Sequence, residues 1–528
     1  MEKLAIGVDV GTTQAKAVAF QANGTVVASS YVRYPLIQET EGMAEQDPET
    51  LFQAVVNCIR TVTQQVKNQP IGLISFASAM HGLIAMDAQG RPLTQVITWA
   101  DTRASDYAEA LKETPAAQLF YQLTGMPVHP MAPLYKIRWL QENQPAVAQS
   151  AAKFIGIKDY IFYRFFSEYW TDYSSASGMG LFNIHTRQWE SSILAYLSIE
   201  EEQLPKVAPS TFIFPALAPS WQEMLGVEEE TVLVLGGADG PLSNLGLGAL
   251  GMGVATLTVG TSGALRYIVE EPFLHPQGET FCFALDEQHW VIGGASSNGA
   301  VALDWASQTI FAEERQQAIQ NGTNLYDPIM AKIATVPAGA NGLLFHPYLL
   351  GERAPLWNAE ASASFIGLRK NHHAGHLARA VVEGICFNLK TILEDLKQLG
   401  GPVQEIRATG GFADSPVFRQ IMADVLGETL SFTDSTEASA LGAVLLGWQG
   451  LGQLPNLQAA AQQVLVHETV TPRADQLLVY QELYPVFQET QQVLAQSYQK
   501  LAEFRKFLIV NSFDKWLRSC LTRRETKT

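Results

Sequence analysis

The start of the chain alternates apolar and polar positions with the period of two that is typical of β-strands. Two apolar, partly β-branched runs, 4–10 and 15–20, predict neighbouring strands. The Asn-Gly pair at 23–24 predicts a tight turn into a third strand over 25–30. The chain is therefore expected to begin with a small set of antiparallel strands.

The turn between the first two predicted strands carries groups that can bind phosphate oxygens. It contains Gly11, Thr12 and Thr13, and Lys16 follows in the next strand. Backbone N–H groups and hydroxyls in such a turn can point at one spot. Asp9 could stand beside a hydrated Mg²⁺. An ordinary hairpin with a tight glycine turn explains these residues equally well.

The same pattern returns about half a chain later. Residues 258–267 align with 9–18, because each segment has a strand, a Val-Gly-Thr turn followed by Thr or Ser, and a second strand. A repeat at this distance predicts two like domains, since a solenoid repeats every 20–50 residues or so. Two such hairpins facing each other across a cleft would hold a nucleoside triphosphate. Thr258 stands at the position of Asp9, so only the first copy offers a carboxylate there.

Strand and helix patterns alternate along the rest of the chain, which predicts an α/β protein. Asp47 and Pro48 mark the start of a helix that runs to about residue 67. The apolar run 71–77 predicts the next strand, and a long amphipathic helix is expected over 377–399.

Asp239 is the candidate catalytic base. It is the single charge in the apolar stretch 231–265, whose glycines and Pro241 favour buried strands and turns over a membrane span. It follows a predicted strand and lies in a glycine turn, where a substrate can approach closely. A carboxylate in this place could take the proton of a phosphoryl-accepting hydroxyl, or it could simply cap the turn.

Length and charge restrict the class of protein. The 528 residues exceed what one core accommodates, and we expect domains at 1–248 and 249–499. A basic, aromatic-containing helical extension is expected at 500–528, packed on the protein. The net charge of −17 leaves no basic excess for nucleic acid, so neither nucleic-acid nor membrane association is expected. A homodimer is left open.

Cysteine spacing and the N-terminus point to the cytoplasm. The four cysteines are far apart and form no Cys-x-x-Cys pair, which favours a reducing compartment over disulfides or a metal site. The first residues do not form the charged, apolar and cleavage regions of a signal peptide. A cytoplasmic location is therefore expected.

Several local motifs have competing interpretations. The Gly-x-Gly-x-x-Gly string at 246–251 precedes a strand and does not open a helix, so we reject it as a dinucleotide fingerprint, and no P-loop string occurs. Gly410 and Gly411, between a strand and a helix, could let a nucleotide approach the backbone or could form an ordinary turn. The histidines at 372, 373 and 376 are better explained as a solvated helix start than as metal ligands.

Polar side chains gather near predicted strand ends of the first half. His81 and Trp99 are among them, as are His129 and Lys136. Asp101 and Arg103 could bind sugar hydroxyls, or they could pair with each other as part of the structure.

Taken together, these motifs resemble those of the FGGY carbohydrate kinases, most closely the gluconokinases of that family. The likeness covers nearly all of residues 3–450. It is carried by the two Val-Gly-Thr hairpins, the turns at Asp239 and Gly410, and the segments 78–83, 98–101, 127–136, 260–266, 345–358, 367–387 and 407–412. The basic tail after Lys500 lies outside it.

The resemblance implies a fold, a pair of ligands and a set of site residues. The fold would be α/β, with two actin-like (ribonuclease-H-like) ATPase domains and a cleft between them. ATP and Mg²⁺ would be the cofactors, Asp239 the base, and Asp9 a support for Mg²⁺ through water. The ATP phosphates would face Thr12, Thr13, Lys16, Gly260 and Thr261. The nucleotide pocket would include Gly299, Gly410, Gly411 and Ser415. The sugar would contact Met80 and His81, with Asp101 nearby.

The implied reaction is transfer of the ATP γ-phosphoryl to D-gluconate. The acceptor's carboxylate would need a cation, for which Arg103, His129, Lys136 and Arg266 are the candidates. The alternatives are a kinase for xylulose, glycerol or another neutral sugar or polyol. An actin-like or chaperone-like ATPase switch is an alternative of a different class, which the Asp239 turn and the polar residues around His81 disfavour.

Overall fold

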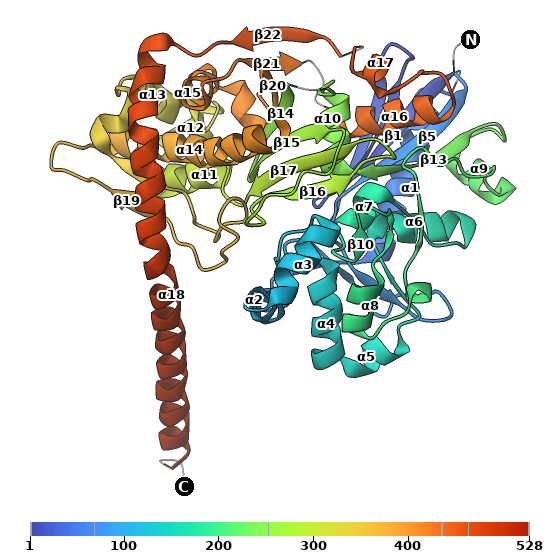
Figure 1. Cartoon of the computed structure of the whole chain (residues 1–528), viewed down its shortest axis with the longest axis horizontal. Coiled ribbons are helices and arrows are strands. Elements are labelled where there is room, and N and C mark those ends of the chain that lie inside the picture. The colour runs from blue at the N-terminus through green and yellow to red at the C-terminus, as the bar shows by residue number, and fades with distance from the viewer. Residues whose placement is uncertain (1–2, 68, 252, 434–436, 463, 526–528) are drawn as a thin grey trace.

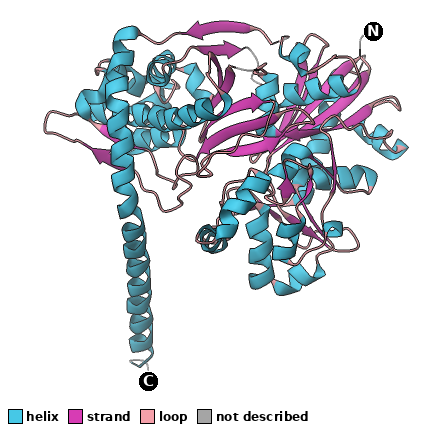
Figure 2. Cartoon of the chain, in the orientation of Figure 1, coloured by secondary structure: helices cyan, strands magenta, loops and turns pink. Residues whose placement is uncertain are grey.

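The computed structural model describes residues 3–67, 69–251, 253–433, 437–462 and 464–525. Two sheets, each with helices packed on it, lie side by side, and a long C-terminal helix projects away from them (Figure 1). The expected α/β class is confirmed, because strands and helices alternate through both halves (Figure 2).

The first sheet is built from the opening strands of the chain. Its strand order is β13-β5-β1-β2-β3. The strands β1, β2 and β3 are antiparallel neighbours, whereas β5 and β13 run parallel to β1. The bounds are β1 (Leu4–Val10), β2 (Gln14–Phe20), β3 (Val26–Arg33), β5 (Ile71–Ser78) and β13 (Val232–Ala238).

The second sheet repeats this arrangement. Its order is β16-β17-β15-β14-β20-β21-β22, with β14, β15 and β17 antiparallel and β20 and β21 parallel to β14. The bounds are β14 (Val254–Val259), β15 (Gly263–Val269), β16 (Phe281–Ala284), β17 (Trp290–Ser296), β20 (Glu405–Thr409), β21 (Leu430–Thr433) and β22 (Val466–Val470). The prediction of two like domains is confirmed, because β14 and β15 occupy the places of β1 and β2.

The remaining elements of the first half surround and extend its sheet. The helices are α1 (Pro48–Gln65), α2 (Ser105–Lys112), α3 (Pro115–Thr124), α4 (Pro133–Asn143), α5 (Pro145–Ser150), α6 (Ile157–Phe166), α7 (Tyr173–Ser177), α8 (Ser191–Leu197), α9 (Pro219–Leu225) and α10 (Asp239–Gly246). The short strands are β4 (Glu45–Gln46), β6 (Ile84–Met86), β7 (Val96–Ile97), β8 (Lys153–Ile155), β9 (Trp170–Asp172), β10 (Phe182–Asn183), β11 (Gln188–Trp189) and β12 (Lys206–Ala208). Helix α1 begins as predicted, since the Asp47 side chain accepts the N–H of Thr50 and Pro48 opens the helix.

The second half adds mostly helices to its sheet. They are α11 (Ala300–Thr309), α12 (Ala312–Asn321), α13 (Asp327–Ala334), α14 (Ala374–Gly400), α15 (Pro416–Leu426), α16 (Ala438–Gly450), α17 (Leu457–Ala461) and α18 (Ala474–Glu525), with the strands β18 (Leu344–His346) and β19 (Ser364–Ile366). The long amphipathic helix expected over 377–399 is α14, which is buried along most of its length.

Two small-residue helices join the halves by close backbone contact. Helix α10 packs against α16, and α16 also covers β1 and β5 of the first sheet. A Cβ atom at Gly442 would lie 1.9 Å from the carbonyl oxygen of Leu242, and one at Gly246 would lie 1.8 Å from that of Ala438. Only glycine permits this approach, so the relative position of the two halves depends on these glycines.

The C-terminal region described by the structure is helical. Helix α18 begins at Ala474 in the second half and runs through residue 500 to Glu525. Figure 2 shows this long helix projecting from the body of the protein. Tyr480 anchors its first part, because its hydroxyl contacts both Glu383 and Arg379 of α14. Farther along, Phe504 is largely exposed and stacks on Phe507 of the same helix, while Arg505 contacts Ser362 and Glu360. No helix in the described ranges is long and apolar enough to cross a membrane.

Candidate functional site

Asp239 lies where β13 ends and α10 begins. The end of β13 is held in place by a hydrogen bond in which the N–H of Ala238 donates to the Ser174 hydroxyl (2.9 Å). Burial raises the pKa of Asp239, while the positive charge of Arg266 acts in the opposite direction. A buried carboxylate at the start of a helix, held by a rigid strand, suits a proton acceptor.

A cavity of about 220 Å³ adjoins Asp239. Both halves of the chain contribute to it. Its lining comprises Thr12, Ala79, Met80, His81, Trp99, Met131, Asp239, Gly240, Pro241, Ser262, Gly263, Ala264, Arg266, Phe281, Phe283, Ala295 and Arg353. The structure therefore brings together Met80, His81 and Asp239 in one cavity suited to a small polar molecule, and Thr12, which was expected at the ATP phosphates, lines the same cavity.

His81 presents a hydrogen-bond acceptor to this cavity. Its Nδ1 lies 2.6 Å from the carbonyl oxygen of Gly178, and burial lowers its pKa to about 3. The ring is therefore neutral, with Nδ1 donating, so that Nε2 is left as an acceptor for a hydroxyl. The backbone of His81 has a φ of 65°, a conformation that costs free energy and is found often at binding sites.

A second cavity, of about 520 Å³, lies on the other side of the β14–β15 turn. Of the predicted nucleotide residues, Gly260, Thr261, Gly411 and Ser415 line it. Leu303, Tyr326, Met330, Phe412 and Phe418 add apolar and aromatic surface that the sequence analysis did not single out. This combination suits a nucleotide, with its base against apolar groups and its phosphates at the glycine turn.

The β14–β15 turn separates the two cavities. Gly260 and Thr261 line the larger one, while Ser262 and Gly263 line the smaller one. Gly299 packs directly on this turn. A Cβ at that position would lie 2.5 Å from the backbone of Ser262, so the contact requires glycine. Gly410 packs in the same way on Val259, so both glycines act through packing. A phosphoryl group at the turn could pass from one cavity to the other.

Asp9 has the properties expected of a group that supports a cation. Its Oδ1 is buried without a hydrogen-bond partner in the described structure. Burial, with the negative charge of Asp239, raises its pKa to about 7. Carboxylate oxygens and water are the ligands that Mg²⁺ prefers, so Asp9 fits the predicted role. Its counterpart Thr258 is likewise buried without a partner for its hydroxyl in the described ranges.

The other residues of the first turn have protein partners. Lys16 forms an ion pair with Glu437, with Nζ–Oε distances of 2.8 and 2.9 Å. The Thr12 hydroxyl accepts the indole N–H of Trp99 (2.8 Å), and the Thr13 carbonyl accepts the N–H of Tyr34. Thr13 does not line either cavity. Thr12 thus lines the smaller cavity beside Asp239, whereas the first hairpin's direct role toward phosphate stays a prediction.

Asp101 and Arg103 pair with each other, which is the structural alternative considered above. Asp101 is buried, accepts the N–H of Ala44 and binds Arg103 through Oδ2 (2.7 Å). Arg103 also contacts Glu45 and lies over the ring of Trp139. Neither residue lines the smaller cavity beside Asp239, so the structure does not place them at the expected sugar site.

Lys136 and His129 also have structural surroundings. The Lys136 ammonium donates to the carbonyl oxygens of His81, Ile97 and Thr98, and burial lowers its pKa to about 7. Lys136 thereby fixes the loops around His81. Burial and the charge of Arg353 hold the pKa of His129 well below its usual value, so its ring is neutral. Of the four cation candidates, only Arg266 lines the cavity.

Arg353 is the main site residue that the sequence analysis missed. It follows Glu352 in a loop, stacks over Trp99 (5.0 Å from the ring centre) and donates to the carbonyl oxygen of Ser296. Its Nε is buried without a partner in the described structure. The segment 345–358 had been singled out, but its arginine shows no local signal of lying near Asp239.

The histidines at 372, 373 and 376 form a helix start, as predicted. The His373 side chain caps α14 by accepting the N–H of Gly375, and the His376 ring accepts the N–H of His373. These contacts occupy Nδ1 of both rings, which favours a structural role.

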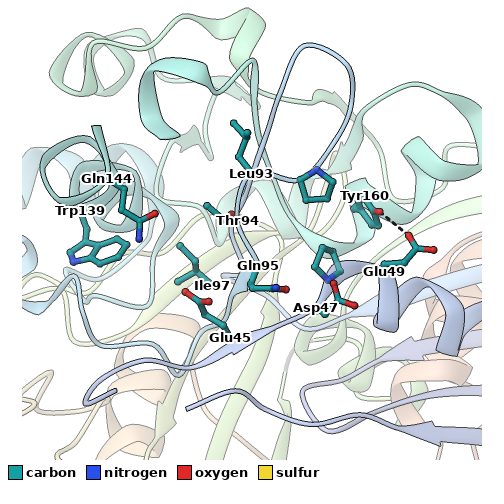
Figure 3. Close-up of a pocket in the computed structure, with 12 residues that line it drawn as sticks. Glu45, Asp47, Glu49, Leu93, Thr94, Gln95, Ile97, Trp139, Gln144 and Tyr160 are labelled. Carbon is teal, nitrogen blue, oxygen red and sulfur yellow. Dashed lines mark hydrogen bonds between the residues drawn. The ribbon is translucent and has the colours of Figure 1, made fainter. Parts of the chain in front are cut away.

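A larger cavity, of about 570 Å³, lies in the first half (Figure 3), and Asp239 is not among the residues that line it. Glu45, Asp47 and Glu49 line it. Their carboxylates are already engaged, by Arg103, by the N-terminus of α1 and by Arg164. Three carboxylates would repel an anionic ligand, so size alone does not make this cavity the phosphate site.

The buried ion pair that supports the end of β13, next to Asp239, leads to a testable prediction. Lys158 and Asp172 form an ion pair at most 2% exposed, and Asp172 also binds Ser174, whose hydroxyl holds Ala238. Breaking a buried pair leaves an uncompensated charge, so Asp172→Asn should lower the free energy of unfolding by about 3–5 kcal/mol and reduce kcat. Urea unfolding measures the first effect. The matched variant Glu168→Gln breaks the exposed pair with Lys206 and should cost below about 1 kcal/mol. If the two variants lost the same free energy of unfolding, the structural role assigned to the Lys158–Asp172 pair would be contradicted.

Comparisons with known proteins agree with this geometry. The family models "FGGY family of carbohydrate kinases, N-terminal domain" and "C-terminal domain" match residues 4–246 and 255–450. The gluconokinase of Bacillus subtilis (strain 168) is 41% identical over 513 residues, which cover 97% of this chain and all of the relative.

Solved structures match over nearly the whole chain. A gluconate kinase from Lactobacillus acidophilus has a TM-score of 0.90 and 39% identity, covering 94% of this chain and 99% of its own. A ligand-bound xylulose kinase from the same organism has a TM-score of 0.90 and 38% identity, covering 94% and 100%. The expected fold of two actin-like domains is thereby confirmed. The chain is an ATP-dependent phosphotransferase that belongs to the FGGY family of carbohydrate kinases.

Proposed function

We propose that the acceptor is D-gluconate and the product 6-phospho-D-gluconate. The observation that carries this proposal is the charge of the acceptor cavity. Arg266 and Arg353 both line it, and Asp239, which serves as the base, is the carboxylate that lines it with them. A cavity with two guanidinium groups favours an anionic acceptor over a neutral one. The 41% identity to a gluconokinase supports the same acceptor.

The proposed reaction follows from the positions of the two cavities. Gluconate occupies the smaller cavity with its 6-hydroxyl at Asp239, and ATP occupies the larger one with its phosphates at the β14–β15 turn. Asp239 takes the hydroxyl proton as the oxygen attacks the γ-phosphorus, and the bond from that phosphorus to the β-phosphate oxygen breaks. His81 accepts a hydrogen bond from an acceptor hydroxyl and orients the substrate.

Mg²⁺ is part of the proposal through Asp9. Bound with ATP, the ion would neutralise charge on the phosphates. Asp9, whose Oδ1 is buried and without a partner in the described structure, would hold one of its waters. Closure of the two halves around both substrates would exclude water from the transfer.

An acceptor panel tests the assignment. Release of ADP from Mg-ATP should be fastest with gluconate and at least about tenfold slower, as kcat/KM, with xylulose, ribulose and glycerol, because the neutral acceptors cannot pair with the guanidinium groups. A reaction without acceptor measures the background. The likeness to a xylulose kinase makes xylulose the competing acceptor. A preference for xylulose would retain the fold and the role of Asp239 but reject gluconate.

A further inference from the structure

Arg266 is a cavity-lining cation without a protein partner. In the described part of the chain its guanidinium makes no hydrogen bond and no ion pair, and Asp239 is the charge that acts on it. By contrast, Arg103, Arg164 and Arg379 all pair with carboxylates. An arginine with five N–H donors facing a cavity is poised to receive a planar anion.

The residues around Arg266 leave space for its guanidinium at the cavity. Its Nε lies 2.9 Å from the point that a Cβ at Gly240 would occupy, so glycine at that position makes room for the guanidinium. Residue 266 pairs with Gly293 in the neighbouring strand, where the absent side chain makes room for the ring of Phe281, which also lines the cavity. Gly240 therefore leaves space for the Arg266 guanidinium at the cavity beside Asp239.

Arg353 brings a second guanidinium to the same cavity. Its Nε is buried and has no partner in the described ranges, although its terminal nitrogen donates to Ser296. Burial lowers the pKa of Arg353 to about 10, and the charge of Arg266 contributes to that shift, which places the two groups within electrostatic reach. Two like charges within reach of each other repel, and an anion bound between them would offset that repulsion.

We propose that Arg266 binds the carboxylate of a sugar-acid acceptor, with the guanidinium of Arg353 as a second positive group at the same cavity. This proposal rests on the proposed function, since it names the group that makes the site selective for an acid. The selectivity arises because a neutral acceptor would leave the two guanidinium groups unpaired in a partly desolvated cavity.

A comparison of gluconate with its neutral amide, gluconamide, tests the subsite. The two ligands differ only in the charged group and keep the same 6-hydroxyl. For the wild-type protein we expect calorimetric binding of gluconate to be about 100-fold tighter than that of gluconamide, as for a buried charge pair. Arg266→Gln should reduce this ratio to below about fivefold, by weakening gluconate and leaving gluconamide nearly unchanged. Arg266→Lys should restore part of the ratio.

Controls separate this role from others. Arg164→Gln removes an arginine that pairs with Glu49 outside the cavity and should leave the ratio unchanged. If Arg266→Gln weakens both ligands equally, or if the ratio collapses only in Arg353→Gln, the assignment to Arg266 is overturned. Binding and turnover are measured separately. A wild-type protein that binds gluconate through Arg266 but phosphorylates only neutral sugars would keep the subsite and reject the proposed function.

Discussion

Asp239→Asn should lower kcat by about 1,000-fold, because the acceptor hydroxyl loses the carboxylate that takes its proton. Binding of ADP should change little, since Asp239 lines the acceptor cavity and not the nucleotide cavity. Coupled measurement of ADP release gives the first quantity, and calorimetric titration with ADP gives the second. Asp106→Asn, an exposed aspartate in α2, is the matched control and should retain full activity.

The pH dependence of the reaction provides a second readout of the same residue. Burial raises the pKa of Asp239 above the ordinary value of 3.8. The base acts only when ionised, so kcat/KM should fall as the pH drops through this raised pKa, and the acid limb should lie above pH 3.8. Retained turnover in Asp239→Asn would remove this residue from the role of base.

Gly442→Ala should lower the free energy of unfolding by about 3 kcal/mol or more. Alanine normally stabilises a helix relative to glycine by about 1 kcal/mol. Here the new Cβ would lie 1.9 Å from the carbonyl oxygen of Leu242, and a backbone atom can yield only if α10 and α16 separate. Because α10 begins at Asp239, that separation should also reduce kcat. Thermal and urea unfolding measure the loss.

The control for this substitution is Gly260→Ala. No atom lies within 4 Å of the corresponding Cβ position, so the stability should change by less than about 1 kcal/mol, although the residue lines the nucleotide cavity. A stabilised Gly442→Ala protein would show that helix propensity outweighs the close contact and that the two helices tolerate a wider spacing.

Local sequence was sufficient for much of the fold and part of the site. The two Val-Gly-Thr hairpins, the turn at 410–411 and the helix start at Asp47 all depend on residues within a few positions of each other, although residues 239–241, expected as a glycine turn, form the start of α10. Turn chemistry and side-chain periodicity act over such short distances, so they can be recognised without the tertiary structure. The duplication then predicted two like sheets, which the strand order confirms.

Sequence reasoning failed where the partner of a polar residue lies far away along the chain. Asp101 and Arg103 seemed equally suited to a sugar or to each other, and only the packing of Glu45 and Ala44 around them shows the pair. Lys136 seemed a candidate for an anion until three carbonyl oxygens were found around its ammonium. The sequence around a charged residue does not indicate which group will contact it in the folded protein.

By itself, the sequence predicted the α/β class and the internal repeat, which the structure confirms, and it pointed to Asp239 and the two hairpin turns as candidates, because each is encoded in short-range patterns of size, polarity and backbone freedom. Tertiary structure alone decided which cations face the acceptor. It brought Arg353 to Arg266 and joined Lys16 to Glu437, 421 positions away. The physical reason is that burial and pairing of charges depend on long-range packing, which places groups together that no local pattern connects.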